Sequence, residues 1–146
     1  MSQQKIKITQ DFPMPVDQLF DYLGEHENLA AIFAPTKVTR VCDGDTSRNG
    51  VGSVRKLQIL IAPPFYETVT KCEPNELVEY KITKGSPLKN HLGVMKFQST
   101  DKGSRLDWTI TFEGKLPLIA SVVGPGLGTT IRKGLKQLSK SPPVSA

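Results

Sequence analysis

The sequence of 146 residues lacks the features that mark several specialised classes of protein. No apolar run approaches the roughly 18 residues that a membrane-spanning helix needs, so we expect no integral association with a membrane. The opening residues, MSQQKIKITQ, are polar and then alternate, unlike the apolar stretch of a secretory signal.

Cysteine and histidine are also scarce. The two cysteines, Cys42 and Cys72, lack the spacing of a metal motif, and we expect free thiols and a cytoplasmic protein. The two histidines, His26 and His91, are isolated, without clustered cysteines or carboxylates around them. The sequence therefore predicts neither a metal site nor a cofactor.

Acidic residues are absent from the last part of the chain, after Glu113. Five basic residues follow it and account for the whole formal net charge of +5: Lys115, Arg132, Lys133, Lys136 and Lys140. Such a segment can attract anionic lipid, nucleic acid or acidic ligands, but a solvated helix face is the simpler interpretation. Because no aromatic residues interleave with these bases, we expect no nucleic-acid partner.

What the chain does contain is a series of alternating apolar and polar stretches, which predict strands. Strands are expected at 5–12, 37–42, 53–61, 65–72, 76–83, 90–99 and 104–113, and helices at 17–24, 25–33 and 117–140. The last strand is the clearest, because one of its faces is wholly apolar and the other polar. Within the final helix, Gly124-Pro125-Gly126 predicts either a kink or the start of the helix.

This order of elements predicts an α+β fold. A curved antiparallel sheet of about six to seven strands would wrap around one long C-terminal helix, and two short helices after the first strand would cover one end. Residues 1–140 would form a single domain, because no linker or internal repeat divides them, and residues 141–146 would form a disordered tail. The oligomeric state stays open.

Polar side chains occur on strand faces that should be dry: Arg55, Glu67, Tyr80, His91 and Trp108. A core built only for stability would not hold an arginine, a carboxylate and an imidazole there, whereas a core shaped around a ligand would. If the chain turns near residues 61–62, Arg55 lies opposite Glu67 and forms an inward cross-strand ion pair. That pair is either a plain buried salt bridge or an anchor for a ligand carboxylate, phenol or carbonyl.

The other inward polar residues also leave alternatives open. Three interpretations of His91 stay open. It is either a half-exposed strand residue near the rim of the sheet, a hydrogen-bonding group in a pocket, or a general base. Tyr80 and Trp108 are large amphipathic rings that either pack in the core or stack on a flat ligand. His26 lies in a polar helical segment and is expected at the surface.

Several local strings carry a resemblance to a known superfamily. They are Gly50-Val51-Gly52-Ser53-Val54-Arg55, Glu67 on the next strand, Tyr80-Lys81-Ile82, and Gly85-Ser86-Pro87-Leu88-Lys89-Asn90-His91. Together with the order of elements, they resemble the START and birch-pollen-allergen-like helix-grip (SRPBCC) superfamily. The subgroup that looks most similar is that of small bacterial polyketide cyclase/dehydratase-like proteins, and the resemblance covers nearly the whole chain.

The resemblance implies a deep cavity between the sheet and the long helix, usually occupied by a hydrophobic ligand. Its candidate gates are residues 61–65 and 84–88. Combined with the alternation along the strands, it predicts ligand contacts at Arg55, Leu57, Ile59, Glu67, Tyr80, His91, Met95, Trp108 and Ile131.

The leading hypothesis is a protein that binds an apolar or aromatic small molecule, such as a lipid or polyketide. One alternative is a polyketide cyclase or dehydratase, in which Glu67 or His91 abstracts a proton while Arg55 stabilises the enolate. Another is a protein-interaction module like the chaperone-activator relatives, which requires an exposed apolar patch and a closed or filled cavity. The sequence does not name the ligand.

Overall fold

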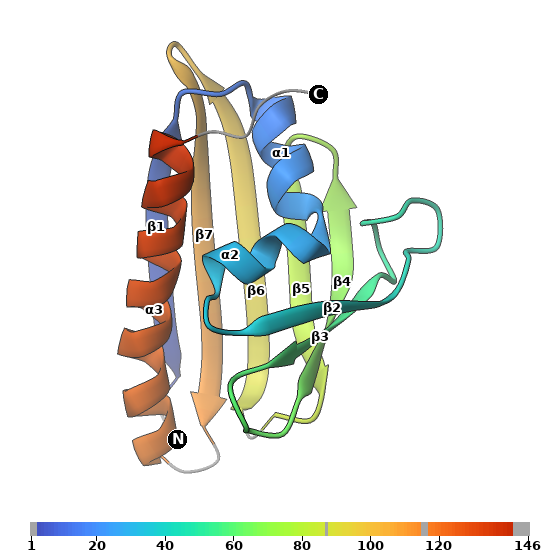
Figure 1. The fold of residues 1–146 in the computed structure, drawn as a ribbon, viewed down its shortest axis with the longest axis vertical. Coiled ribbons are helices and arrows are strands. Elements are labelled where there is room, and N and C mark those ends of the chain that lie inside the picture. Colours follow the sequence, from blue (N-terminus) through green and yellow to red (C-terminus); the bar gives the residue numbers. More distant parts are fainter. Residues whose placement is uncertain (1–2, 87, 115–116, 142–146) are drawn as a thin grey trace.

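A computed structural model describes residues 3–86, 88–114 and 117–141. Within these ranges, seven strands form one antiparallel sheet in the order β1-β7-β6-β5-β4-β3-β2 (Figure 1). The strands are β1 (Gln4–Phe12), β2 (Lys37–Cys42), β3 (Val54–Gln58), β4 (Phe65–Glu73), β5 (Leu77–Lys84), β6 (Leu88–Thr100) and β7 (Gly103–Gly114). The helices are α1 (Val16–Gly24), the short 3₁₀ helix η1 (His26–Asn28), α2 (Leu29–Ile32) and α3 (Pro117–Lys140). The predicted α+β architecture is confirmed.

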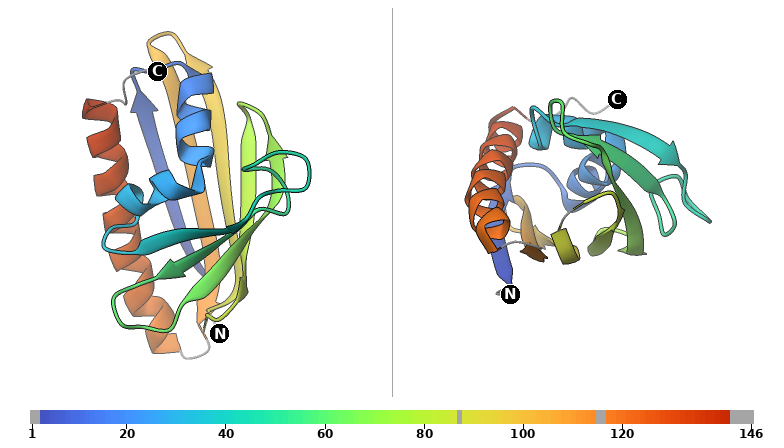
Figure 2. Two further views of the ribbon diagram at one scale, coloured as in Figure 1. Left: turned by 45° about the vertical axis from the view of Figure 1, so that its right-hand side comes forward. Right: turned by 90° about the horizontal axis from the view of Figure 1, so that it is seen from below.

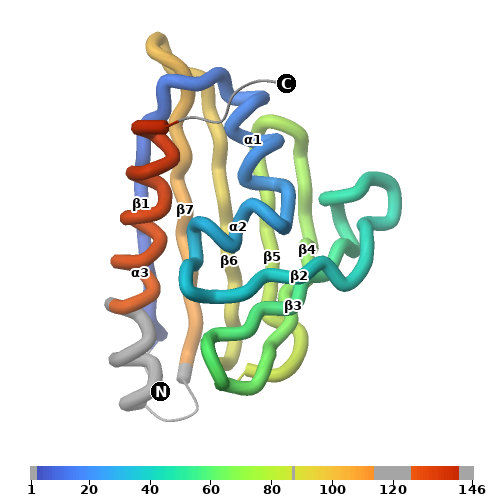
Figure 3. Tube along the Cα trace, in the orientation of Figure 1, coloured from blue at the N-terminus to red at the C-terminus, as the bar shows by residue number. Residues whose placement is uncertain are grey.

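The sheet curves strongly, and the helices lie along and within the curve (Figure 2). Helix α3 packs against β1, β7 and α2. Its apolar stripe of Ile131, Leu135 and Leu138 is buried in the core, as expected from the helical spacing of these residues. The segment that leads from α2 into β2 therefore passes close to α3 (Figure 3).

Some boundaries differ from the sequence-based expectation, and the start of α3 agrees with it. The strand expected to reach residue 61 ends at Gln58, because Leu60 adopts a φ of 51° and the Ala62 N–H donates to the Ile59 carbonyl at 3.0 Å. The helix expected at 25–33 is divided into η1 and α2. Helix α3 begins at Pro117, so the alternative that it starts at 124–126 is wrong.

The register of the hairpin β3–β4 places Arg55 opposite Glu67, as predicted. The register of β6 against β7 shifts between Lys89 and Leu92, and Asn90 at this irregularity has a φ of 51°. Such a bulge re-aims the neighbouring side chain. Its place beside His91 makes it part of the architecture of the site. Of the tail expected at 141–146, residues 142–146 lie outside the described ranges, as does Lys115.

Candidate functional site

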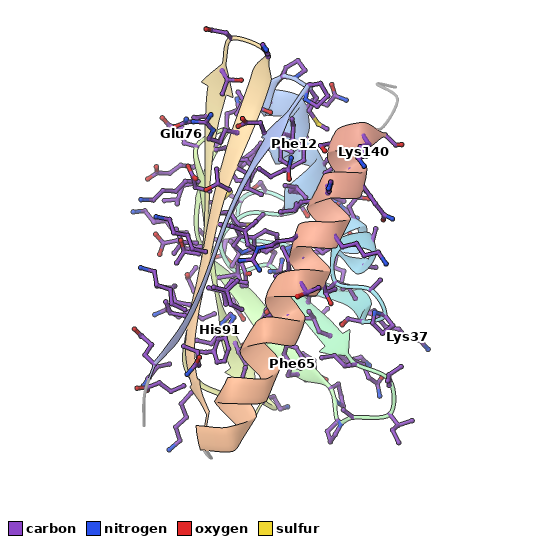
Figure 4. The ribbon with its side chains drawn as sticks, turned by 90° about the vertical axis from the view of Figure 1, so that its left-hand side faces the viewer. Phe12, Lys37, Phe65, Glu76, His91 and Lys140 are labelled. Carbon is purple, nitrogen blue, oxygen red and sulfur yellow. The ribbon has the colours of Figure 1, made fainter. Side chains whose placement is uncertain are left out.

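A cavity of about 720 Å³ lies between the sheet, α3 and the segment after α2. Phe65 and His91, which both line it, lie toward the end of the molecule opposite Phe12 and Lys140 (Figure 4). The wall is mostly apolar or small, and its residues are Phe33, Ala34, Pro35, Thr36, Leu57, Ile59, Ala62, Pro63, Phe65, Glu67, Tyr80, Ile82, Gly85, Ser86, Leu88, His91, Ile110, Phe112, Gly126, Leu127 and Thr130. The volume and the lining are typical of a small-molecule site.

Both candidate gates contribute to the wall. Ala62 and Pro63 come from the β3–β4 connection, and Gly85 and Ser86 come from the β5–β6 connection. The tip of the first connection is apolar yet exposed, since Ile61 retains 99% of its accessible surface. These two connections border the cavity, while the sheet forms its floor.

The polar part of the floor is built on the hairpin β3–β4. The Arg55 Nε donates to Glu67 Oε1 at 2.8 Å, and both residues are buried. The Arg55 guanidinium also lies 4.7 Å from the centroid of the Tyr80 ring. A buried carboxylate needs such a partner, because desolvation of an unpaired charge is costly.

His91 adds the second polar group. Its Nδ1 accepts a hydrogen bond from the Ile82 backbone N–H at 3.0 Å, and its Nε2 lies 3.9 Å from Glu67 Oε2. The described ladder between β5 and β6 ends at the pair Tyr80–Gly93, so the imidazole takes the place of a strand partner for Ile82. Burial lowers the pKa of His91, although the Glu67 carboxylate opposes this effect. His91 is therefore a buried neutral imidazole and not a half-exposed rim residue.

Tyr80 lies over the backbone of Gly93, its cross-strand partner. A Cβ added at Gly93 would overlap the Tyr80 ring, so only glycine leaves room for the ring in this position. The Trp108 Nε1–H donates to the Tyr80 hydroxyl at 2.9 Å. Burial and the nearby Glu67 carboxylate raise the pKa of Tyr80, which keeps the phenol neutral.

Comparison with known proteins agrees with this architecture. A profile described as polyketide cyclase/dehydrase and lipid transport matches residues 3–141. The chain belongs to this family. The match confirms the predicted membership of the helix-grip superfamily and supports a hydrophobic ligand-binding or polyketide cyclase-like protein. A comparison with curated proteins gives no match.

Solved structures show the same fold at low sequence identity. Ara h 8.0201 is 16% identical, with a TM-score of 0.67, 96% of this chain covered and 99% of that one. A protein from Nitrosospira multiformis is 14% identical, with a TM-score of 0.71 and coverages of 94% and 97%. Norcoclaurine synthase from Thalictrum flavum, in complex with dopamine and hydroxybenzaldehyde, is 12% identical, with a TM-score of 0.69 and coverages of 99% and 90%. These similarities establish the fold and leave the ligand open.

In this family member, the predicted site residues fall into two groups. Those that line the cavity are Leu57, Ile59, Glu67, Tyr80 and His91. Those that are buried outside its lining are Arg55, Met95, Trp108 and Ile131. Trp108 packs edge-on against Phe33, with ring centroids 5.7 Å apart, so it acts as core behind the wall. Direct ligand contact stays a prediction for all nine residues.

Sequence reasoning missed a large part of the wall. Phe65, Ile82, Ile110 and Phe112 lie on the inward faces that alternation identifies, so the sequence held a signal for them. The segment Phe33–Thr36 gave no such signal, because it belongs to an irregular connection between α2 and β2.

Two glycines of α3 differ in their surroundings. Gly126 lines the cavity, and a Cβ there would meet nothing within 4 Å. Gly128 is instead packed, since a Cβ would lie 3.5 Å from Ile6 and 3.0 Å from the Arg132 side chain. The surroundings of Gly124 lie outside the described residues.

His26 was expected at the surface, and this expectation is wrong. The side chain is fully buried, and its Nε2 lies 3.1 Å from the Ser53 hydroxyl oxygen. Because the Ser53 hydroxyl donates to the Gly50 carbonyl at 2.7 Å, the His26 Nε2–H must be the donor. Burial and the charges of Arg55 and Arg40 lower the pKa of His26 to about 3.

The two glutamates that flank this buried histidine in the sequence form ion pairs. The Arg40 guanidinium contacts Glu25 at 2.7 Å and Glu27 at 3.0 Å, and Arg48 contacts Glu25 at 2.9 Å. The hydrogen bond from Arg40 lowers the pKa of Glu27 to about 2. The sequence showed two acidic residues beside His26, but their arginine partners come from β2 and the loop after it.

Within the described ranges, no group of histidine, cysteine, aspartate and glutamate side chains has the arrangement of a metal site. Both cysteines are free thiols. Among the described helices, none combines the length and apolar character required to cross a membrane.

Proposed function

We propose that the protein binds an apolar or aromatic small molecule, such as a lipid or a polyketide-like compound, in the cavity beneath α3. The observation that carries this proposal is the cavity of about 720 Å³, with a mostly apolar wall and a few polar groups gathered on β4, β5 and β6. Burial of apolar surface would supply most of the affinity, at roughly 25 cal/mol per Å² before the costs of ordering.

The comparisons support this class of ligand. The family description names polyketide cyclase/dehydrase and lipid transport. Norcoclaurine synthase, which shares the fold, is in complex with two small aromatic compounds, dopamine and hydroxybenzaldehyde. In this chain Glu67, Tyr80 and His91 would orient the polar end of the ligand, and Arg55 would act through Glu67, which it holds in place.

A pair of variants on α3 tests the proposal. Thr130 lines the cavity, whereas Lys133 lies on the same helix, exposed and away from the lining. Thr130→Trp should fill the cavity and weaken the binding of the apolar dye Nile red by about 10-fold or more, because its apolar contacts would be lost. Lys133→Trp should leave the affinity unchanged. Dye fluorescence measures both, and native mass spectrometry identifies any molecule that co-purifies.

Equal affinities in the two folded variants would mean that the dye binds elsewhere. Together with a wild-type protein that captures no apolar compound, this result would overturn the proposal.

One observation favours a second candidate, a cyclase or dehydratase of the polyketide type. Glu67 Oε2 and His91 Nε2 face one another at the wall of the same cavity, and an enolisation requires a base beside a hydrogen-bond donor. Because the Nδ1 lone pair of His91 is already engaged by Ile82, Glu67 is the better base and His91 the better donor to the enolate oxygen. Turnover of a poly-β-keto thioester that survives in Glu67→Gln would exclude this mechanism.

The third hypothesis, a protein-interaction module, stays a hypothesis. It requires an exposed apolar patch and a closed or filled cavity, and the open cavity described above favours ligand binding over it. A cytoplasmic location and the absence of a nucleic-acid partner stay predictions, which cell fractionation and a filter-binding assay would test.

A further inference from the structure

Two buried side chains on the cavity wall each have one polar atom committed to the protein and one turned toward the other. Glu67 retains 5% of its accessible surface and His91 retains 9%. Glu67 Oε1 accepts from Arg55, and His91 Nδ1 accepts from the Ile82 backbone N–H. The second atoms, Glu67 Oε2 and His91 Nε2, lie 3.9 Å apart.

The hydrogen bond from Ile82 determines where the imidazole proton lies. An N–H donor at 3.0 Å from Nδ1 requires a lone pair on that nitrogen, so the proton of the neutral ring is on Nε2. Burial disfavours a second proton and lowers the pKa of His91; the Glu67 carboxylate opposes this effect, and the positive charge of Arg55 adds to it. The pair therefore presents one donor, the Nε2–H, beside one acceptor, the carboxylate oxygen.

The separation of 3.9 Å is too long for a direct hydrogen bond, but it fits one oxygen atom between the two groups. An oxygen about 2.8 Å from each would make an angle of roughly 90° between them, which a hydroxyl group can accept. We propose that Glu67 and His91 form a subsite for a single neutral hydroxyl group of the ligand, which accepts from His91 Nε2–H and donates to Glu67 Oε2. The inference deepens the proposed function and rests on it.

Other polar groups satisfy only half of this subsite. A carbonyl or ether oxygen can accept from His91, but it leaves the Glu67 carboxylate facing another acceptor. A carboxylate ligand would face Glu67 with a like charge in a buried place. The remaining wall is mostly apolar. The geometry therefore favours apolar alcohols and phenols over fatty acids.

Three probes with one alkyl chain and different head groups test this selectivity: 4-octylphenol, 4-octylanisole and 4-octylbenzoate. Isothermal titration calorimetry on the wild-type protein should show that the phenol binds about 10-fold to 100-fold tighter than the other two, since a hydrogen bond to a charged group is lost in each. Equal affinities within about twofold, or a preference for the benzoate, would overturn the inference while leaving cavity binding intact. Failure of all three to bind would overturn the proposed function as well.

Variants of the subsite sharpen the test. Glu67→Gln should reduce the preference for the phenol over the benzoate by about 10-fold, because the like charge is removed. Arg55→Gln combined with Glu67→Gln keeps a neutral pair in the same place and avoids an unpaired buried arginine, in case the single variant does not fold. Thr70→Val, which removes an exposed hydroxyl from β4 outside the cavity lining, should leave the preference unchanged. An unchanged preference in folded Glu67 variants would also overturn the inference.

Discussion

At the scale of single residues, close contact between Tyr80 and Gly93 determines the shape of the wall. The ring occupies the space that a Cβ at Gly93 would need, and its hydroxyl accepts from Trp108. The ring is also in contact range of Arg55 and His91, with a distance of 5.5 Å between the Tyr80 and His91 ring centroids. One glycine therefore allows the polar groups of the site to assemble around one aromatic ring.

Gly93→Ala is expected to destabilise the protein by about 1–3 kcal/mol, because the added methyl group forces the Tyr80 ring out of a packed core. Chemical denaturation followed by circular dichroism measures this change, and Trp108 fluorescence should shift as its hydrogen bond to Tyr80 is disturbed. Gly126→Ala is the matched control, since a Cβ there meets nothing within 4 Å. If Gly93→Ala left the free energy of unfolding unchanged, the Tyr80 ring would not need the space beside Gly93.

His26 links stability to pH at the same scale. Its pKa is about 3 in the folded protein, below the ordinary value of about 6.5 in an unfolded chain. The unfolded state therefore binds the proton first as the pH falls, and stability decreases from about pH 6.5 toward about pH 3. The buried neutral His91 acts in the same direction.

Between about pH 7.5 and pH 5, His26 alone should cost about 2 kcal/mol of unfolding free energy. Urea titrations at the two pH values should show that His26→Gln loses correspondingly less stability than the wild type over this interval. An identical pH dependence in both proteins would contradict the assignment of this loss to His26.

At the scale of elements, the contact between α2 and α3 positions the part of the wall that strands do not provide. A Cβ added at Gly134 of α3 would lie 2.8 Å from the Ile32 Cα and 3.0 Å from its carbonyl oxygen. The two backbones thus approach closely, and Phe33–Thr36, which follow Ile32 directly, line the cavity. The packing of these two helices therefore places this edge of the cavity.

Gly134→Ala should separate the helices, because the obstructing atoms belong to backbone and cannot rotate away. We expect the free energy of unfolding to fall by about 1–3 kcal/mol. In an unobstructed helix, the same change from glycine to alanine would instead raise it by roughly 0.5–1 kcal/mol. Thermal or chemical unfolding measures the first effect, and the affinity for Nile red reports the displacement of the cavity edge. Stabilisation by this substitution would show that α2 yields to the added methyl group.

At the scale of the whole molecule, a packed region and a hollow region share one sheet. Fully buried Leu19, Leu23 and Leu106 belong to the packed core and do not line the cavity. The cavity is bordered by the connections β3–β4 and β5–β6. Its wall residues Phe65 and His91 lie away from Phe12 and Lys140 (Figure 4). The packed region supplies the burial that a stable domain needs, so the hollow region can be left open to a ligand.

The amino-acid sequence by itself determined the strands, the long helix and their order, because alternation and helical spacing are local properties of the chain. It also determined the pairing of Arg55 with Glu67, since a short hairpin leaves few possible registers. Alternation placed Glu67, Tyr80 and His91 on inward faces, and all three line the cavity.

Only the tertiary structure decided which inward residues meet the cavity and which meet each other. Trp108 and Met95 share faces with lining residues but are covered by neighbouring elements, and alternation cannot distinguish a packed part of a sheet from a hollow one. The fold brings His26 to Ser53 and brings the neighbouring Glu25 to arginines of β2 and the loop after it, all of them distant in the sequence. A bulge lies beside His91, whose ring contacts Ile82 and faces Glu67, and strict alternation along a strand does not predict such a backbone irregularity.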